Sequence, residues 1–220
     1  MRISGRYSFT LVLLIAFFIT EAQKDKNATG FIITLQNDTL PCTFKQKNWK
    51  KQPIQIAVSY SGKDTSYSPE TINGFFVTSS GVEFASRTTR LTNYTEKLQD
   101  ATTSRVPEIG DPQKLFLKTL YKGNFTLYSF LDKLKGKRFF IEGPNNLVEL
   151  YTHYYVRLPA ALSNEIPVTV LDRSFEFVLK TLMNPCRALF NIIENIGLDE
   201  DQLVQVFKMY DMCLESKKEN

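Results

Sequence analysis

The sequence predicts an α+β protein, in which an antiparallel β-rich body of hairpins and a meander precedes two or three short C-terminal helices. Through most of residues 24–160, apolar residues alternate with polar ones or form short β-branched runs between turn residues. Beyond residue 161 the apolar spacing changes to the three- and four-residue period of helices. We therefore expect a β-rich region at residues 24–160 and a helical region at residues 161–220. The helical region should pack on the β-rich region, because short helices are not stable alone.

The β-rich region should begin with two β runs around a polar turn, at residues 31–35 and 39–44. Asn37 and Asp38 provide the turn chemistry between them. Pro41 predicts that the second run is an edge strand or begins late, because proline cannot donate a ladder hydrogen bond. Residues 54–60 alternate cleanly and predict a half-buried strand. Strands are also expected on both sides of the turn at residues 79–81.

A polar stretch separates these runs from the clearest β segment. Residues 93–112 contain two prolines and few apolar residues, which predicts a long irregular excursion. The β runs after it are separated by turns so short that neighbouring strands must be antiparallel, which predicts a meander. These runs are residues 115–121, 125–131, 137–142 and 147–151. Residues 152–167 favour neither a strand nor a helix.

Three helical stretches are expected near the C-terminus. The first begins at Asp172 or Ser174 as a cap and continues to about Met183, where Asn184 and Pro185 break it. The second ends before Gly197, and the third follows Asp199 and ends near Cys213.

Residues 1–23 have the three-part layout of a secretory signal peptide. Two arginines precede an apolar run at residues 9–19, and small or polar residues follow it. At about 1.5 Å per residue the run spans about 18 Å, which is short of the ~30 Å hydrocarbon core. We expect cleavage after Ala22 or Gln23, and no transmembrane span in the chain that remains. A retained anchor and a buried strand are the alternatives.

The charge distribution argues against a nucleic-acid partner. The formal charge of +4 becomes +3 when two arginines and one glutamate leave with residues 1–23, and lysines are scattered. The densest clusters lie at residues 45–52 and 132–138. They could form a patch for an anionic glycan, a lipid headgroup or nucleic acid. Lysines in turns and on edge strands serve more often to prevent unwanted pairing, and an exported protein rarely meets nucleic acid.

Three cysteines allow three single disulfides, and the sequence alone does not choose among them. Export would place them where disulfides persist. Cys186 and Cys213 share the helical region, which favours a bridge between them. On the chain-entropy model a loop of this length contributes about 3.5 kcal/mol. Cys42 would then be a buried free cysteine, which behaves as a small hydrophobic residue.

The sequence contains no recognisable catalytic constellation and implies no cofactor. There is no GxSxG motif, no glycine-rich phosphate loop and no CxxC pair, and His153 is the single histidine. A histidine among tyrosines is more often structural than catalytic. No metal site is expected.

Several motifs resemble a family of exported Bacteroidetes proteins. They are "GFIITLQNDTLPCTF", "NWKKQPIQIAVSY", "YSPETINGFFV", "FLKTLYKGNFTLYSF", "KRFFIE" and the closing "YDMC", which together cover residues 30–213. Longer members of the family carry an outer-membrane β-barrel after this module. The resemblance implies a bacterial envelope setting and supports the Cys186–Cys213 pair. "LPC" stands where the family pattern prefers Lys-Gly, so Cys42 is peculiar to this chain. The family has no assigned activity, so the resemblance implies no catalytic residues.

The leading hypothesis from the sequence is a non-enzymatic module of the cell envelope, in the periplasm or at the outer membrane. Its partner would be an envelope protein, a peptide or a glycan. The expected contact residues are the aromatic and lysine side chains of two segments, namely Trp49, Lys50, Lys51, His153, Tyr154 and Tyr155. The alternative is an exported hydrolase that uses carboxylates or His153. It requires His153 in a cleft, within hydrogen-bond reach of a carboxylate or a cysteine.

Overall fold

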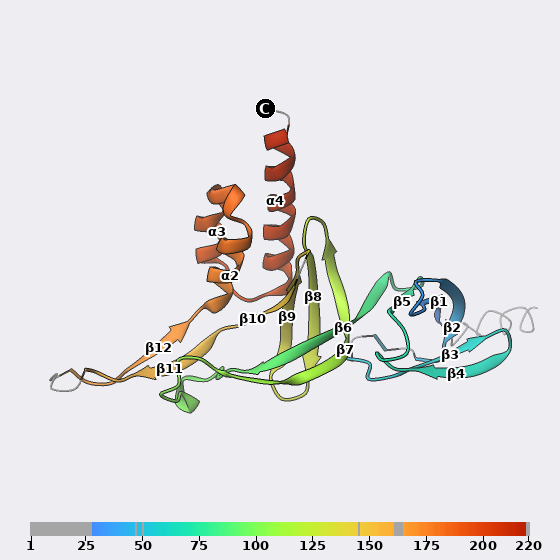
Figure 1. The fold of residues 1–220 in the computed structure, drawn as a ribbon, viewed down its shortest axis with the longest axis horizontal. Helices are drawn as coiled ribbons and strands as arrows, with labels where there is room; N and C mark the ends of the chain where they lie inside the picture. The colour runs from blue at the N-terminus through green and yellow to red at the C-terminus, as the bar shows by residue number, and fades with distance from the viewer. Residues whose placement is uncertain (1–27, 47, 50, 145, 161–164, 219–220) are drawn as a thin grey trace, which may run out of the picture.

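The computed structural model describes residues 28–46, 48–49, 51–144, 146–160 and 165–218, and it confirms the predicted α+β class (Figure 1). The strands of the large sheet are β1 (Ala28–Ile33), β2 (Thr39–Phe44), β3 (Ile56–Tyr60), β4 (Lys63–Tyr67), β5 (Gly74–Val77), β6 (Val82–Asn93), β7 (Glu108–Lys122), β8 (Thr126–Asp132), β9 (Gly136–Glu142) and β10 (Leu147–Leu150). A separate two-stranded sheet contains β11 (His153–Arg157) and β12 (Val168–Asp172). The helices are η1 (Leu98–Asp100), α2 (Ser174–Leu182), η2 (Asn184–Leu189), α3 (Phe190–Asn195) and α4 (Glu200–Lys218).

One antiparallel sheet joins both halves of the β-rich region. Its ten strands lie in the order β10-β9-β8-β7-β6-β5-β1-β2-β3-β4. The predicted meander is confirmed as the continuous series from β7 to β10, whose turns are as short as the sequence indicates. The first hairpin, β1 with β2, lies next to β5 rather than at an edge of the sheet.

Pro41 lies in the part of β2 that has a partner strand on one side only. It lies opposite Phe31 of β1, whereas β3 pairs with β2 only at Thr43 and Phe44. β2 is thus not an edge strand of the whole sheet, but it is one locally where the proline requires it.

The irregular stretch is shorter than the sequence predicts. β6 extends to Asn93 and β7 begins at Glu108, so residues 94–107 remain between the strands instead of 93–112. The first residues of β7 are exposed on both faces. Because neither face is apolar there, the alternation that reveals a half-buried strand is missing.

The two strands β11 and β12 form an arm that projects away from the helices (Figure 1). The sequence between residues 152 and 167 is ambiguous, and the structure places β11 there, paired with β12. The first long helix, α2, begins at Ser174, close to the start that the sequence predicts, and β12 precedes it within the region expected to be helical. The alternating run of β12 is too short and too exposed to be distinguished from a loop by periodicity.

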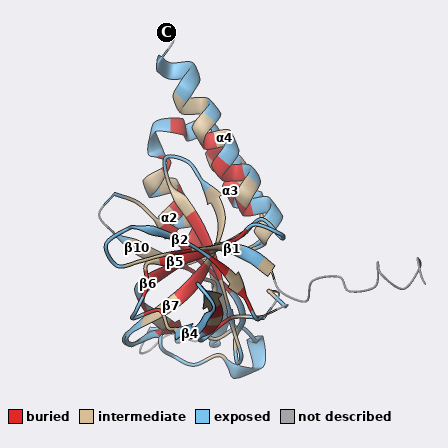
Figure 2. Cartoon of the chain, turned by 90° about the vertical axis from the view of Figure 1, so that its right-hand side faces the viewer, coloured by how far each residue is buried: buried red, intermediate tan, exposed pale blue. Residues whose placement is uncertain are grey.

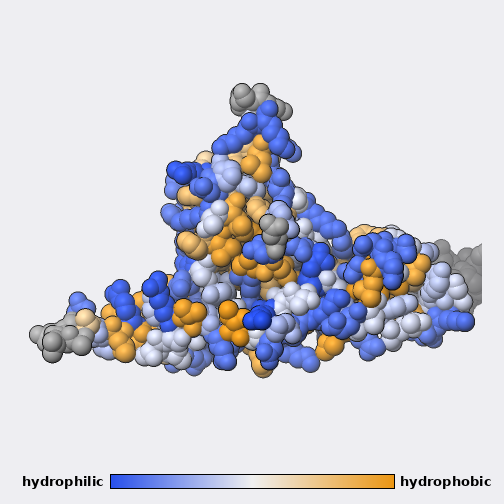
Figure 3. Space-filling view, viewed as in Figure 1, coloured by the Kyte–Doolittle hydropathy of each residue, from blue (hydrophilic) through white to orange (hydrophobic). Residues whose placement is uncertain are grey.

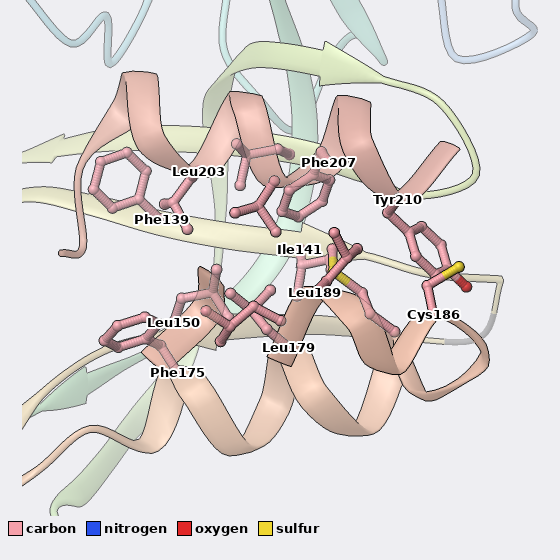
Figure 4. Close-up of a cluster of buried hydrophobic side chains, with 14 residues drawn as sticks. Phe139, Ile141, Leu150, Phe175, Leu179, Cys186, Leu189, Leu203, Phe207 and Tyr210 are labelled. Carbon is pink, nitrogen blue, oxygen red and sulfur yellow. The ribbon is translucent and has the colours of Figure 1, made fainter. Parts of the chain in front are cut away.

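The C-terminal helices pack on the meander, as expected. Figure 4 shows their apolar side chains facing those of β9 and β10. The buried cluster combines both sets: Leu127, Phe139, Ile141, Leu150, Phe175, Leu179, Met183, Cys186, Leu189, Ile193, Leu203, Val206, Phe207 and Tyr210. Burial of apolar surface contributes about 25 cal/mol per Å². This contact therefore stabilises α2, which at 9 residues is too short to form alone.

The disulfide that the cysteine context favours is present. Cys186 and Cys213 are bonded, with their Cα atoms 6.2 Å apart, and they connect the start of η2 with the C-terminal half of α4. Cys42 is free and buried, with 8% of its surface exposed. It lies in a second cluster beside Phe44 and Val58, and burial raises the pKa of its thiol to about 11. The thiol is therefore protonated and apolar in character at neutral pH.

Figure 2 shows that the buried residues gather along the middle of the large sheet and under the helices. In the described part of the chain, no helix combines the length and the apolar character needed to span a membrane. The predicted signal peptide, residues 1–23, lies outside the described residues.

Candidate functional site

Trp49 and Lys51, two of the predicted contact residues, lie in the loop between β2 and β3, and Lys50 lies outside the described residues. The indole of Trp49 packs edge-on to the Phe44 ring at 5.3 Å and tilts against Phe75 at 5.5 Å. It is half-buried, so one part of the ring is anchored and another part reaches the surface. An aromatic side chain held in this way offers a rigid apolar surface with little entropy to lose on binding.

Gln52 fixes this loop over the middle of the large sheet. Its Nε2 donates to the carbonyl of Phe116 on β7, and its Oε1 accepts from the N–H of Leu131 on β8 at 3.2 Å. One side chain thus joins the loop to two neighbouring strands. The position of Trp49 relative to the sheet is set by these hydrogen bonds as well as by ring packing.

A cleft of about 290 Å³ opens beside Trp49, and we call it the Trp49 cleft. It lies where the β2–β3 loop, the sheet and the start of α4 meet. Its lining residues are Trp49, Lys51, Gln52, Phe84, Lys118, Ser129, Leu131, Lys137 and Glu200.

The Trp49 cleft is cationic, because three lysines and one carboxylate line it. Lys137 Nζ lies 2.6 Å from Glu200 Oε2, and Lys118 Nζ lies 3.7 Å from Glu200 Oε1. Lys51 forms no ion pair with a described residue. All three lysines remain solvent-accessible. One carboxylate cannot neutralise three ammonium groups, so an anion in the cleft would meet a net positive field.

This combination suits a ligand that is both anionic and partly apolar. Lysine ammonium groups provide mobile point charges with three donors each, which match carboxylate or sulfate oxygens. The indole of Trp49 and the side chain of Leu131 provide an apolar surface for a flat C–H face such as that of a sugar ring.

His153, Tyr154 and Tyr155 lie far from the Trp49 cleft, on β11 in the arm (Figure 1). His153 is 2% exposed. Its Nδ1 accepts from the N–H of Thr95 at 2.9 Å, so Nε2 carries the hydrogen and donates to the carbonyl of Ser104 at 2.9 Å. The imidazole therefore pins residues 94–107 to the arm at two points. Both ring nitrogens are bonded to backbone groups, so the geometry that a His153-dependent hydrolase requires is not found.

The two tyrosines support the same attachment. The ring of Tyr155 stacks on His153 with centroids 6.3 Å apart, and the N–H of Tyr154 donates to the carbonyl of Thr95. Both side chains are half-buried rather than freely exposed. Apolar side chains do line the outer part of the arm, as Figure 3 shows, and they include Leu158, Ile166, Val168 and Leu171.

A buried ion network lies where β6, β9 and β10 meet. Arg138 is 4% exposed, and it lies 2.6 Å from Glu149 and 2.7 Å from Asp132. Its Nη1 also donates to the carbonyl of Thr92, and its guanidinium lies 4.9 Å from the centre of the Tyr94 ring. Each buried charge has a partner, as burial demands. The network holds the end of β6 against β9 and β10.

The sequence predicts contact residues in the loop that forms one wall of the Trp49 cleft, but it does not predict the opposite wall. Lys137 belongs to a lysine cluster that the sequence shows, although the cluster alone more often marks a solvated turn. Lys118 and Glu200 have no local signal, because they are brought to the cleft by sheet pairing and by the docking of α4. No group of three His, Cys, Asp or Glu side chains suited to a metal ion occurs among the residues with described positions.

Comparisons of the chain with models of protein families, with curated proteins and with solved structures give no match.

Proposed function

We propose that this chain is an exported, non-enzymatic binding module of a Bacteroidetes-type cell envelope, and that the Trp49 cleft binds an acidic glycan. The layout of residues 1–23 supports export to the periplasm or the outer membrane. The observation that carries the glycan proposal is the juxtaposition of one anchored indole with three lysines at a single cleft.

The Trp49 cleft should bind an acidic glycan more tightly than a neutral one. A neutral sugar would gain only apolar contact with Trp49 and Leu131. An acidic sugar would also pair its carboxylates with Lys51, Lys118 and Lys137, and each exposed pair contributes about 0.2–1 kcal/mol. Several such pairs together shift affinity by about tenfold or more, because 1.4 kcal/mol corresponds to a factor of ten.

The first test compares two trisaccharides by isothermal titration calorimetry on the processed chain. A trimer of galacturonic acid should bind with an affinity at least about tenfold higher than a trimer of galactose. Added salt should weaken the acidic trimer selectively, because surface charges are screened. Equal binding of the two trimers, or no binding of either, would overturn the glycan proposal.

A double lysine variant and a control variant test whether the acidic trimer binds at the Trp49 cleft. The double variant Lys118→Gln with Lys137→Gln should weaken the acidic trimer by roughly ten- to thirtyfold, since it removes two cations and leaves Glu200 unpaired. Lys208→Gln is the matched control, because Lys208 is an exposed lysine of α4 outside the cleft. If the control weakens binding as much as the double variant, the ligand does not bind at the cleft.

Export has its own test. Cell fractionation should place the protein outside the cytoplasm, and its first residue should be Gln23 or Lys24. An intact leader on a cytosolic chain would contradict this part of the proposal.

A further inference from the structure

Glu200, the first residue of α4, lines the Trp49 cleft and pairs with two of its three lysines. Its carboxylate oxygens lie 2.6 Å from Lys137 Nζ and 3.7 Å from Lys118 Nζ. Lys118 belongs to β7 and Lys137 to β9, so one carboxylate bridges two strands across β8. Within the described residues, neither lysine forms an ion pair with any other carboxylate.

The large sheet presents both lysines on one face. Lys118 lies opposite Ser129 of β8, and Lys137 lies opposite Leu131 of the same strand. Because Ser129 and Leu131 are two residues apart, all four side chains point to the same side of the sheet, where they line the cleft. The backbone positions of the two lysines are therefore fixed by strand pairing and do not depend on Glu200.

The start of α4 is held by residues other than Glu200. Asp199 Oδ1 accepts from the N–H of Asp201 at 3.0 Å and from the N–H of Gln202 at 3.3 Å, which is the arrangement of an N-cap. Leu203, in the same turn, is fully buried against the meander. The first turn of α4 should therefore stay folded when the charge of Glu200 is removed.

The ion pairs of Glu200 are open to exchange with an anion from solution. More than a quarter of each of the three side chains is exposed, from 26% for Glu200 to 48% for Lys137. Exposed pairs of this kind are weak, because water screens them. The carboxylate of an acidic sugar has the same charge and the same two acceptor oxygens as that of Glu200. It would therefore compete for the same ammonium donors.

We propose that Glu200 is an internal competitor that limits how tightly the Trp49 cleft binds acidic ligands, an inference that rests on the binding of an acidic glycan at this cleft. Without a ligand, Glu200 pairs with Lys118 and Lys137. A ligand carboxylate takes its place between the two lysines, and the side chain of Glu200 turns toward water. The affinity for acidic ligands is therefore lower than the three lysines alone would give.

Glu200→Gln tests this competition, because it removes the charge and keeps the length of the side chain. The variant should bind the trimer of galacturonic acid about three- to tenfold more tightly than the original chain, since two exposed pairs no longer have to be broken. Its affinity for the trimer of galactose should not change. Isothermal titration calorimetry measures both affinities.

Asp201→Asn is the matched control. It makes the same change of charge one residue further along α4, at an exposed side chain outside the cleft. It should change the affinity for the acidic trimer by less than about twofold, because salt screens charges that are not in contact. A gain as large as that of Glu200→Gln would show that only the net charge of the protein matters, and it would contradict the competition.

A double-mutant cycle tests whether Glu200 acts through the two lysines. In the Lys118→Gln, Lys137→Gln background, Glu200→Gln should raise the affinity for the acidic trimer by less than about twofold, because no ammonium group is released. An equal gain in the two backgrounds would mean that Glu200 does not act by occupying these lysines.

Sulfate is a probe that does not depend on a sugar. Followed by the amide chemical shifts of Lys118 and Lys137, it should bind Glu200→Gln at least about threefold more tightly than the original chain. If sulfate does so while the acidic trimer binds neither chain, the glycan proposal fails and the competition stands. If the trimer binds both chains with equal affinity, the glycan proposal stands and Glu200 is not a competitor. If neither probe binds the variant more tightly, the competition is likewise excluded.

Discussion

At the scale of single residues, the stability of the fold depends on one buried ion network, which consists of Arg138, Asp132 and Glu149. Arg138 and Glu149 are both almost fully buried, and the guanidinium of Arg138 lies 2.6 Å from the carboxyl group of Glu149. Replacing one partner leaves the other charged and unpaired away from water, which is costlier than losing an exposed pair.

We predict that Arg138→Met lowers the free energy of unfolding by about 3–5 kcal/mol, because the carboxylate of Glu149 stays buried without its cation. Urea denaturation measures the change. Lys45→Met is the control, since the Lys45–Asp64 pair is exposed on the surface and its loss should leave the free energy of unfolding nearly unchanged. Similar losses in the two variants would contradict the structural role given to Arg138.

A second residue-scale prediction concerns acid stability through Glu142. Burial raises the pKa of this carboxyl, but hydrogen bonds from Arg87 and Tyr128 outweigh burial and hold the pKa below its ordinary value of 4.5. The unfolded chain therefore binds more protons than the folded chain as the pH falls below 4.5. The stabilisation from Glu142 is complete above that pH and is lost as the pH drops toward the folded pKa.

Urea midpoints measured from neutral pH down to about pH 3 should show this loss in the original chain. Glu142→Gln should be less stable at neutral pH and should lose less stability on acidification. Glu70→Gln, at an exposed glutamate, should keep the full pH dependence. An unchanged acid profile in Glu142→Gln would count against the hydrogen-bonded role of this carboxylate.

Sequence alone does not reveal these residue roles, because they depend on pairing between distant segments. Arg138 and Glu149 appear in the sequence as ordinary charged residues of a meander, and only strand register places them together. Trp49 and Lys51 were found as a cluster because they are adjacent in the chain. The tyrosine neighbours of His153 favour a structural role over a catalytic one, but the sequence also predicts it as a contact residue, and at 2% exposure it is not one. Its partners Thr95 and Ser104 could not be predicted from the sequence.

At the scale of elements, α4 is attached to the rest of the molecule by two kinds of bond from one turn of its C-terminal half. The disulfide joins Cys213 to η2. Asp211 accepts from the Tyr121 hydroxyl at 2.6 Å and from the side chain of Asn124 at 2.8 Å, which fastens the same turn of the helix to the β7–β8 hairpin. This hydrogen bond also raises the pKa of Tyr121 to about 12.

We predict that Cys186→Ser with Cys213→Ser lowers stability by about 3.5 kcal/mol, because the unfolded chain regains the entropy of an open loop. Hydrogen exchange should accelerate in the C-terminal half of α4 more than in its first turns, where Leu203 and Val206 stay packed. Uniform acceleration along α4 would mean that the disulfide does not act as a local brace.

Elements with strong periodicity were predictable, and those without it were not. The meander and the helices follow from alternation and from three- and four-residue spacing. The outer part of the β6–β7 hairpin and most of β12 carry polar or exposed side chains on both faces. Their strand character therefore arises from hydrogen-bond pairing, which the residue pattern does not record.

At the scale of the whole molecule, one long sheet carries two separate hollows, the Trp49 cleft and a groove between β6 and β10, which share no lining residue. The Trp49 cleft lies where the N-terminal strands, the meander and α4 meet, and the groove between β6 and β10 lies toward the arm. The sequence grouped the segments around Trp49 and His153 as one set of contact residues. The structure places them at different ends of the molecule, so they cannot bind one small ligand together (Figure 1).

The most direct test of the central claim uses Trp49 itself, because it is the single tryptophan of the chain. Its fluorescence is followed while the trimer of galacturonic acid is added to the processed protein. Binding at the Trp49 cleft predicts a saturable change that follows the calorimetric affinity and is reduced in the Lys118→Gln, Lys137→Gln double variant. Fluorescence that stays constant while the trimer binds would show that the ligand does not contact the cleft.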